Sequence, residues 1–276
     1  MDAKIVTLSE NTAGMDLGLL GEHGLSIYVE TPGFSLLFDT GQTVSAAHNA
    51  EVLGIDLKGV PIALSHGHVD HTGGLKSVLG KTGPTEVFCH PDVFAQKYAL
   101  KDGKLIDIGL PKTRPDLERM GSSFKISRKP RQLSEGVWLT GEVPRRTDFE
   151  QAEDYLLVRD PVQRVDPLLD DQALVLDLNR GLLVVLGCAH GGVVNTIEQA
   201  RKITGKSRVL GVIGGTHLGF GSTDMNRLER TIEALKHYEL EILGVSHCTG
   251  IAAAARLATE FRDQFIFNTA GNIIEL

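Results

Sequence analysis

The pattern of hydrophobic and polar positions divides the N-terminal half of the chain into short strands and one clear helix. Strands are predicted at 3–8, 24–31, 34–38 and 60–64. Pro32-Gly33 separates the second strand from the third and favours a hairpin. Val44, Ala47 and Leu53 follow helical spacing, and Gly54 is typical of a helix C-terminus. The last of these strands ends at Ser65-His66.

The C-terminal half repeats this order of strands followed by helices. Strands are predicted at 137–140, 155–159, 173–178, 182–186, 208–213, 241–246, 264–267 and 272–276. Apolar faces that begin at Val193, Met225 and Ile251 predict three helices between the later strands. Strands and then helices in both halves predict two sheets packed face to face with helices outside. We therefore expect an α/β (α+β) fold, an αββα four-layer sandwich, as one domain over 1–276.

The middle of the chain is less regular. A strand is predicted at 85–89 and a short helix at 92–98. From about 100 to 135 the sequence is rich in Lys, Arg, Pro and Gly and shows no sustained period. We interpret this stretch as a surface insertion, which is either a functional lid or a solvated loop.

Composition excludes several classes of partner. The formal net charge is −7, which argues against nucleic-acid binding and against attraction to anionic membranes. Three cysteines cannot form a closed disulfide framework and indicate a reducing compartment. The N-terminus resembles no signal peptide, and no window is apolar enough to cross a bilayer. We expect a cytoplasmic protein with a small-molecule substrate, and a homo-oligomer is left open.

Histidines fall at or just after the ends of predicted strands. These are His66, His90, His190, His217 and His247. A single histidine in such a place is more often a surface residue or a satisfied hydrogen-bonding group than a ligand. Several strand ends, however, meet along a common rim of a sandwich. The placement therefore predicts that side chains from distant segments come together there.

The run His66-Gly67-His68-Val69-Asp70-His71 carries the strongest chemical signal. Imidazole and carboxylate groups are ligands that suit divalent zinc, iron or manganese. In an extended loop His66 and His68 point the same way and can bind one ion. Asp70 and His71 are displaced by a turn and can face a second ion. Gly67, between His66 and His68, lets the backbone bend.

At these residues the sequence resembles the metallo-β-lactamase superfamily, whose signature is this His-x-His-x-Asp-His run after a short strand. The likeness covers nearly the whole chain and includes Phe38-Asp39-Thr40-Gly41. Segments at 9–12, 171–174, 186–190 and 247–250 further resemble a subgroup labelled 7,8-dihydropterin-6-yl-methyl-4-(β-D-ribofuranosyl)aminobenzene 5′-phosphate synthases or metal-dependent hydrolases. The resemblance to the superfamily is the stronger of the two.

The resemblance implies a ligand set for two divalent metal ions, with Zn²⁺ as the first expectation and Fe²⁺ or Mn²⁺ as alternatives. It assigns His66 and His68 to the first ion and Asp70 and His71 to the second. His247 matches the final ligand of the second ion, and His190 is the best candidate to complete the first. Asp39 matches a residue that orients the metal loop from behind.

The order of residue types departs from the superfamily at Asp171, which stands where a His is usual, while His190 stands near the usual Asp. It stays open whether Asp171 bridges the metals, binds one of them, or orients a ligand. Cys188 and Cys248 adjoin candidate ligands. Because strand alternation favours the neighbouring His, we interpret the two cysteines as small buried fillers, with thiolate ligation as the alternative.

Two further sets of residues are candidates for binding substrate. His217 either hydrogen-bonds a substrate oxyanion or shuttles a proton, or it only caps the next loop. Arg145 and Arg146 either hold a phosphate or carboxylate, or form an exposed basic pair.

These features together predict a hydrolase. Paired metals lower the pKa of a bound water from about 15.7 towards 7, and Asp70 or Asp171 would accept its proton. The expected substrate is a small anionic ester or phosphoester. The alternatives are a pterin- or phosphoribosyl-type transferase or synthase, and a non-hydrolytic di-iron redox or metal-sensing domain.

Overall fold

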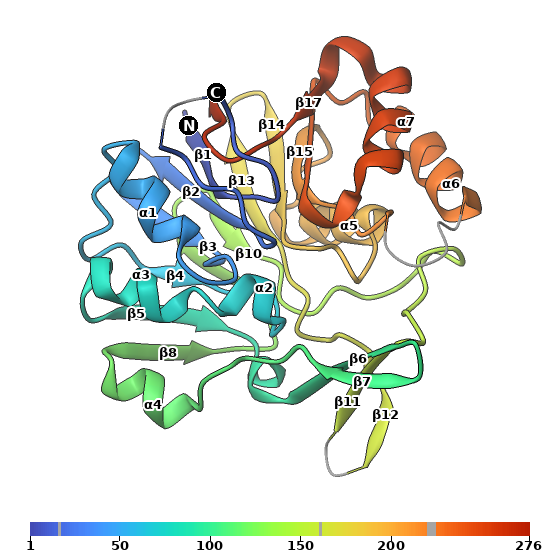
Figure 1. Cartoon of the computed structure of the whole chain (residues 1–276). Helices are drawn as coiled ribbons and strands as arrows, with labels where there is room; N and C mark the ends of the chain where they lie inside the picture. Colours follow the sequence, from blue (N-terminus) through green and yellow to red (C-terminus); the bar gives the residue numbers. More distant parts are fainter. Residues whose placement is uncertain (16–17, 160–161, 220–224) are drawn as a thin grey trace.

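Two large β-sheets form the centre of the molecule. The computed structural model describes residues 1–15, 18–159, 162–219 and 225–276 (Figure 1). The first sheet holds, in spatial order, β18 (Ile273–Glu275), β1 (Lys4–Ser9), β2 (Ser26–Thr31), β3 (Phe34–Phe38), β4 (Ile62–Ala63), β5 (Thr85–Cys89) and β8 (Ser122–Ile126). The second holds β17 (Phe265–Phe267), β16 (Ile242–Ser246), β15 (Val209–Gly215), β14 (Gly181–Leu186), β13 (Leu174–Leu178), β10 (Val137–Leu139) and β9 (Arg131–Ser134).

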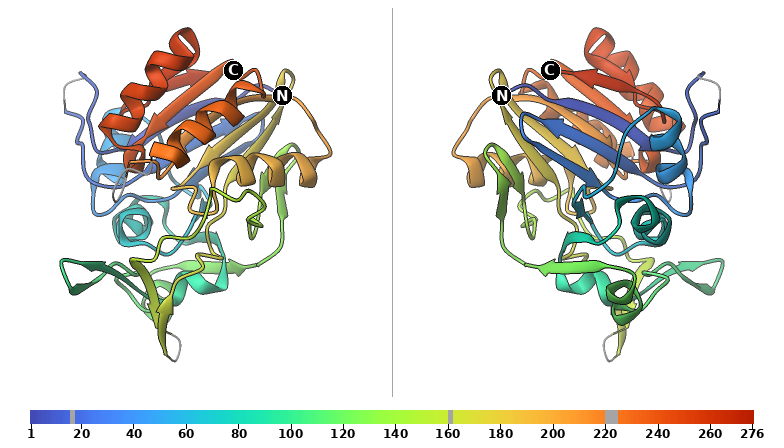
Figure 2. Two further views of the ribbon diagram at one scale, coloured as in Figure 1. Left: turned by 90° about the vertical axis from the view of Figure 1, so that its right-hand side faces the viewer. Right: turned by 90° about the vertical axis from the view of Figure 1, so that its left-hand side faces the viewer.

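Helices cover the outer face of each sheet (Figure 2). On the first sheet, α1 (Ser45–Val52) and α3 (Leu75–Thr82) bury apolar residues such as Ala46 and Val78. On the second, α5 (Val193–Thr204), α6 (Met225–Lys236) and α7 (Ile251–Phe261) do the same with Ile197, Ile232 and Leu257. The αββα sandwich expected from the order of strands and helices is therefore confirmed.

A separate cluster of apolar side chains fills the space between the two large sheets. Phe38 and Leu36 from β3 meet Leu174 and Leu176 from β13, and all four are fully buried. Burying one such aliphatic or aromatic side chain contributes roughly 1.5–3 kcal/mol. The core between the sheets is thus built without help from a metal.

The segment expected to be an irregular insertion is mostly regular structure, and that expectation is wrong. It contains β7 (Lys104–Asp107), α4 (Arg114–Arg119), β8 and β9. The short helix expected at 92–98 is also wrong. A 3₁₀ turn, η1 (Pro91–Phe94), leads there into β6 (Gln96–Lys101).

A third sheet explains why the pattern misled. Its strands are, in order, β12 (Gln163–Val165), β11 (Leu156–Arg159), β6 and β7. This sheet lies at the bottom of Figure 1, and β7 and β12 are exposed along their whole length. Strands with no buried face have no alternation of apolar and polar residues to detect.

The topology brings the C-terminal ends of parallel strands to one rim. In the first sheet β3, β4, β5 and β8 are parallel, and in the second β14, β15, β16 and β17 are parallel. The loops that follow β3, β4, β14, β15 and β16 carry Asp39, His66 to His71, His190, His217 and His247. Within the described ranges, no helix is long and apolar enough to cross a membrane.

Candidate metal centre

Three imidazoles from two loops form a cage at this rim. His66 and His68 follow β4, and His190 follows β14. Their ring centroids lie 4.5–5.1 Å apart, and one donor nitrogen of each lies within 4.8 Å of the others. The three rings are almost fully buried, and no described residue hydrogen-bonds to the Nε2 atom of any of them. Because unpaired buried nitrogens are costly, three that converge fit the donor set of a divalent cation.

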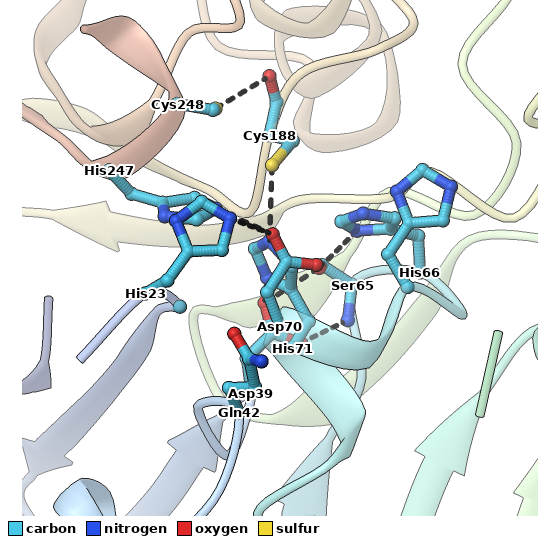
Figure 3. A network of polar contacts seen from close by, with 12 residues as sticks. His23, Asp39, Gln42, Ser65, His66, Asp70, His71, Cys188, His247 and Cys248 are labelled. Carbon is cyan, nitrogen blue, oxygen red and sulfur yellow. Dashed lines mark hydrogen bonds and ion pairs between the residues drawn. The ribbon is translucent and has the colours of Figure 1, made fainter. Parts of the chain in front are cut away.

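A second group of donors lies beside the cage, at Asp70. Asp70 Oδ2 lies 3.1 Å from His247 Nε2, 3.3 Å from His23 Nε2 and 4.0 Å from His71 Nε2 (Figure 3). The His71 ring centroid is 4.3 Å from that of His66, so the two groups adjoin. The structure therefore brings together His66, His68, Asp70, His71, His190 and His247. His23 is an additional donor that the sequence did not suggest.

The loop from His66 to His71, here called the metal loop, is held by Asp39. Asp39 also fixes the tautomers of two imidazoles. Ser65 donates to Asp39 from its backbone N (2.7 Å) and from its Oγ (2.6 Å), and His71 Nδ1 donates to Asp39 Oδ2 (2.7 Å). Since the Ser65 hydroxyl proton goes to Asp39, Ser65 Oγ accepts from His66 Nδ1 (2.9 Å). Both rings therefore keep a proton on Nδ1, and Nε2 is the nitrogen that each ring presents to the site.

His247 is oriented by the start of the chain. Its Nδ1 donates to Asn11 Oδ1 (2.8 Å), which also accepts from the backbone N of Gly24. Its backbone N donates to Glu10 Oε1 (2.6 Å). Nε2 of His247 is thereby directed at Asp70. Sequence reasoning noted the segment Ser9 to Thr12 only as part of a resemblance and gave these residues no role.

The charges around His71 suit a cation. Burial opposes protonation of His71, but the carboxylates of Asp39 and Asp70 raise its pKa to about 9. Burial would raise the pKa of Asp70, yet His71 and the other imidazoles nearby hold it well below the usual range. Burial lowers the pKa of His66 and His68 well below the ordinary value. His66 and His68 are therefore neutral and can donate lone pairs, beside the ionised carboxylate of Asp70. Burial opposes protonation of His190 as well, but the Glu153 carboxylate next to it raises the pKa of His190.

A buried ion triad supports the loop from the third sheet. Asp170 Oδ2 accepts from the backbone N of Gly67 (2.8 Å), and Lys97 Nζ donates to Asp170 (2.9 Å) and to Asp166 (2.7 Å). A Cβ at Gly67 would lie 2.7 Å from the backbone oxygen of Val93, so the close approach requires glycine. The third sheet thus fixes the metal loop through Lys97.

Asp171 lies behind His190 and is not one of the clustered donors. Its Oδ2 accepts from the backbone N of Gly191 (2.8 Å), and burial raises its pKa. No described residue hydrogen-bonds to its Oδ1. Asp170 and Asp171 stand in a turn before β13, so strand alternation does not set their directions.

We expect Asp171→Asn to reduce turnover on the order of 10–100-fold with metal content unchanged, as for loss of a group that orients a ligand. An amide oxygen can still accept from Gly191, which keeps the loss moderate. Metal analysis and steady-state kinetics check this, with Asp177→Asn on the surface of β13 as control. Loss of one metal would instead make Asp171 a ligand.

A polar wall closes the side of the site next to His190. Glu153 Oε2 lies 3.6 Å from His190 Nδ1, and Glu153 Oε1 accepts from Arg227 Nη1 (2.9 Å). His217 lies beside His190, with ring centroids 4.2 Å apart, and its Nε2 is 3.0 Å from the hydroxyl of Tyr155. Sequence reasoning missed Glu153, Tyr155 and Arg227 because no pattern marks them.

Three other expected or suspected residues are engaged elsewhere. Arg145 donates to the backbone oxygens of Pro167 (2.8 Å) and His190 (2.9 Å), so its fork supports the loop. Arg146 is exposed. His90, which also follows a strand, lies 3.1 Å from Glu142 and belongs to none of the donor groups in the described part of the chain.

The fold and this site define a class of protein. A family model for the metallo-beta-lactamase superfamily matches residues 20–202. The chain belongs to this superfamily, and the resemblance drawn from its motifs is confirmed. The superfamily generally binds divalent metals, and the clustered histidines described above fit that property.

One relative and two solved structures are similar to this chain over nearly its whole length. The 7,8-dihydropterin-6-methyl-4-(beta-D-ribofuranosyl)-aminobenzene-5'-phosphate synthase of Methanocaldococcus jannaschii is 34% identical over 284 residues, which cover 99% of this chain and 96% of the relative. The crystal structure of Tm1679, a metal-dependent hydrolase of the beta-lactamase superfamily, matches with a TM-score of 0.85 and 27% identity, covering 99% of each chain. The metallo-beta-lactamase fold protein YhfI of Bacillus subtilis shares the fold at 12% identity, with a TM-score of 0.56 and 99% of each chain covered.

Proposed function

We propose that this protein is a metal-dependent hydrolase that acts with a metal-activated water on a small anionic ester or phosphoester. The observation that carries the proposal is the convergence of three buried Nε2 atoms beside the group of Asp70, His71 and His247. His66, His68 and His190 would hold one divalent ion, and Asp70, His71 and His247 a second. Zinc suits this nitrogen and carboxylate set, and Fe²⁺ and Mn²⁺ are the alternatives.

Such ions supply a nucleophilic water near neutral pH and polarise the bond that is attacked. The protein's own groups do the rest. Burial would raise the pKa of Asp70, but the nearby imidazoles hold it well below the usual range, so this carboxylate would serve as a ligand rather than as the proton acceptor. The His217 and Tyr155 pair, with Nε2 and hydroxyl 3.0 Å apart, can pass a proton to a leaving group at the rim.

Arg227 provides a reason to expect an anionic substrate. Its Nη1 is used by Glu153, while its Nε and Nη2 are buried and have no partner among the described residues. These two atoms form the side-on fork that binds two oxygens of a phosphate or carboxylate. Leaving them unpaired costs roughly 1–3 kcal/mol each, which a bound oxyanion would offset.

We therefore expect Arg227→Met to raise KM for a phosphate-bearing substrate by roughly 10–100-fold, the loss of a charge-assisted hydrogen bond or two. Arg230→Met is the matched control. Arg230 lies one turn further along α6 and pairs with Asp148 on the surface. Kinetics of both variants measure the difference, and an equal KM in the two would remove Arg227 from the substrate site.

Metal-resolved activity screening tests the proposed function. Purified protein is analysed for metal, stripped with chelator and reloaded with Zn²⁺, Fe²⁺ or Mn²⁺ separately. Each form is tested on phosphoesters, lactones and pterin phosphates. We expect turnover that disappears with the metal and returns with one of the three ions. Turnover that persists in fully stripped protein would contradict the proposal.

A second candidate is a synthase, and the identity to the Methanocaldococcus jannaschii enzyme favours it. In that reaction class the metals would activate a leaving group, and an acceptor other than water would attack. A dihydropterin with a diphosphate on its 6-methyl carbon distinguishes the two. Product analysis with and without a ribofuranosyl-aminobenzene phosphate shows which acceptor is used. Hydrolysis releases phosphate or diphosphate and gives the alcohol or its monophosphate whether or not the acceptor is present, whereas a synthase gives a joined product only when the acceptor is present.

A further inference from the structure

A cysteine side chain points into the metal centre. Cys188 Sγ lies 3.1 Å from His71 Nε2, and Figure 3 shows the sulfur directed at His71. Since His71 Nδ1 donates to Asp39, its Nε2 is the atom available to a metal. A sulfur and an imidazole nitrogen therefore face each other in the centre.

Cys188 is also the donor that the separate groups share. Its Sγ lies within 4.8 Å of donor atoms of His66 and His71, of His190 and His217, and of His247 and Cys248. It thus stands between the two halves of the site. The cysteine is 2% exposed, so solvent does not compete for it.

The backbone before Cys188 is packed so that the sulfur is delivered there. A Cβ on Gly187 would lie 2.2 Å from Ser65 Oγ and 3.3 Å from Asp39 Oδ2. Only glycine permits this approach to the pair that holds the metal loop. β14 ends at Leu186 and Ala189 has a positive φ of 55°, so alternation does not separate Cys188 from His190.

The second cysteine of the site is occupied differently. Cys248 Sγ accepts from the backbone N of His217 (3.3 Å) and lies 3.8 Å from the backbone oxygen of Cys188. Cys248 Sγ thus accepts from backbone and also lies within 4.8 Å of donor atoms of Cys188 and His247, whereas Cys188 Sγ lies 3.1 Å from His71 Nε2.

We propose that Cys188 is a thiolate ligand of the two-metal centre, placed between His66 of the first donor set and His71 of the second, so that the centre is a mixed nitrogen and sulfur site. This inference rests on the proposed metal centre and adds a ligand to it. On binding, the S–H bond breaks, a metal–sulfur bond forms and the proton leaves to solvent. A thiolate selects zinc or iron over manganese and magnesium. The earlier interpretation of Cys188 as a buried filler is replaced.

X-ray absorption at the zinc edge of the wild-type, zinc-loaded protein tests this without any substitution. We expect a sulfur shell at about 2.3 Å in addition to nitrogen and oxygen at about 2.0–2.2 Å. A spectrum that fits nitrogen and oxygen alone would overturn the proposal and leave an S–H to His71 contact. Because no substrate is used, the result is independent of whether the protein hydrolyses anything.

Cobalt substitution identifies the sulfur. Co²⁺-loaded wild type, Cys89→Ser and Cys248→Ser should show a near-ultraviolet thiolate charge-transfer band, and Cys188→Ser should lack it. Cys89 is the matched control, because it is buried on β5 and belongs to no donor group within the described residues. Cys188→Ser should also lower zinc affinity by more than the roughly 10–100-fold that loss of an outer partner costs. A band that survives in Cys188→Ser, or disappears only in Cys248→Ser, would contradict the assignment.

Discussion

His68→Ala and Asp70→Ala should each abolish measurable turnover while the protein stays folded. Both side chains lie on the rim, outside the apolar layers, and Asp70 keeps 17% of its side chain exposed. Their loss removes donors from the first and second groups respectively. In the proposed mechanism the attacking water would then lose the metal that lowers its pKa, which would cost several orders of magnitude in rate.

Activity, metal content and a thermal melt on each variant check this expectation. His48→Ala is the control, because His48 is an exposed histidine on α1 that contacts only the backbone oxygen of Gly18 among its recorded hydrogen bonds. The control should match wild type in all three measurements. The expectation fails if either variant loses its fold while the remaining soluble fraction keeps wild-type activity.

Much of this candidate site could be predicted from the sequence because its donor residues stand at recognisable positions. The run from His66 to His71 has the spacing of a metal loop, and His190 and His247 follow strands that the hydrophobic pattern predicts. Parallel strands end at one edge, so the meeting of these side chains is a consequence of topology. The fold was predictable for the same reason, since the alternation in the buried strands is strong.

The site residues that the sequence could not predict lie mainly in segments without hydrophobic periodicity. Glu153 lies in a loop, and Arg227 reaches it across 74 positions in the chain. His23 also stands in a loop and meets Asp70 only through the fold. Asp170 adjoins Asp171 in the chain. It is not one of the clustered donors, but it is fully buried and accepts a hydrogen bond from the backbone N of Gly67.

The metal loop therefore depends on two kinds of support that work from opposite sides. Asp39 and Ser65 act from the first sheet through Nδ1 atoms, and the Lys97 triad acts from the third sheet through the backbone. The third sheet is the part of the fold that the sequence pattern failed to reveal. Its strand β6 carries Lys97, which pairs with Asp170, and Asp170 in turn accepts a hydrogen bond from Gly67 in the metal loop.

Lys97→Met should be the most destabilising single substitution in this region. Lys97 is 1% exposed, and its partners Asp166 and Asp170 are 4% and 0% exposed. Burial would lower the pKa of Lys97, but the two carboxylates raise it, so the ammonium stays charged at neutral pH. Removing it leaves two buried carboxylates without their cation, and breaking a buried pair in this way costs about 3–5 kcal/mol.

The loss should appear both in folding and in metal binding. Chemical denaturation measures the free energy of unfolding, and metal titration measures the loop that Asp170 holds at Gly67. Lys125→Met is the control. Its partner is Glu86, 3.1 Å away on the surface, and an exposed pair contributes about 0–1 kcal/mol. Equal destabilisation in the two variants would show that the triad does not support the site. A loss of stability confined to Lys97→Met, together with weaker metal binding, would show that the third sheet positions the metal loop.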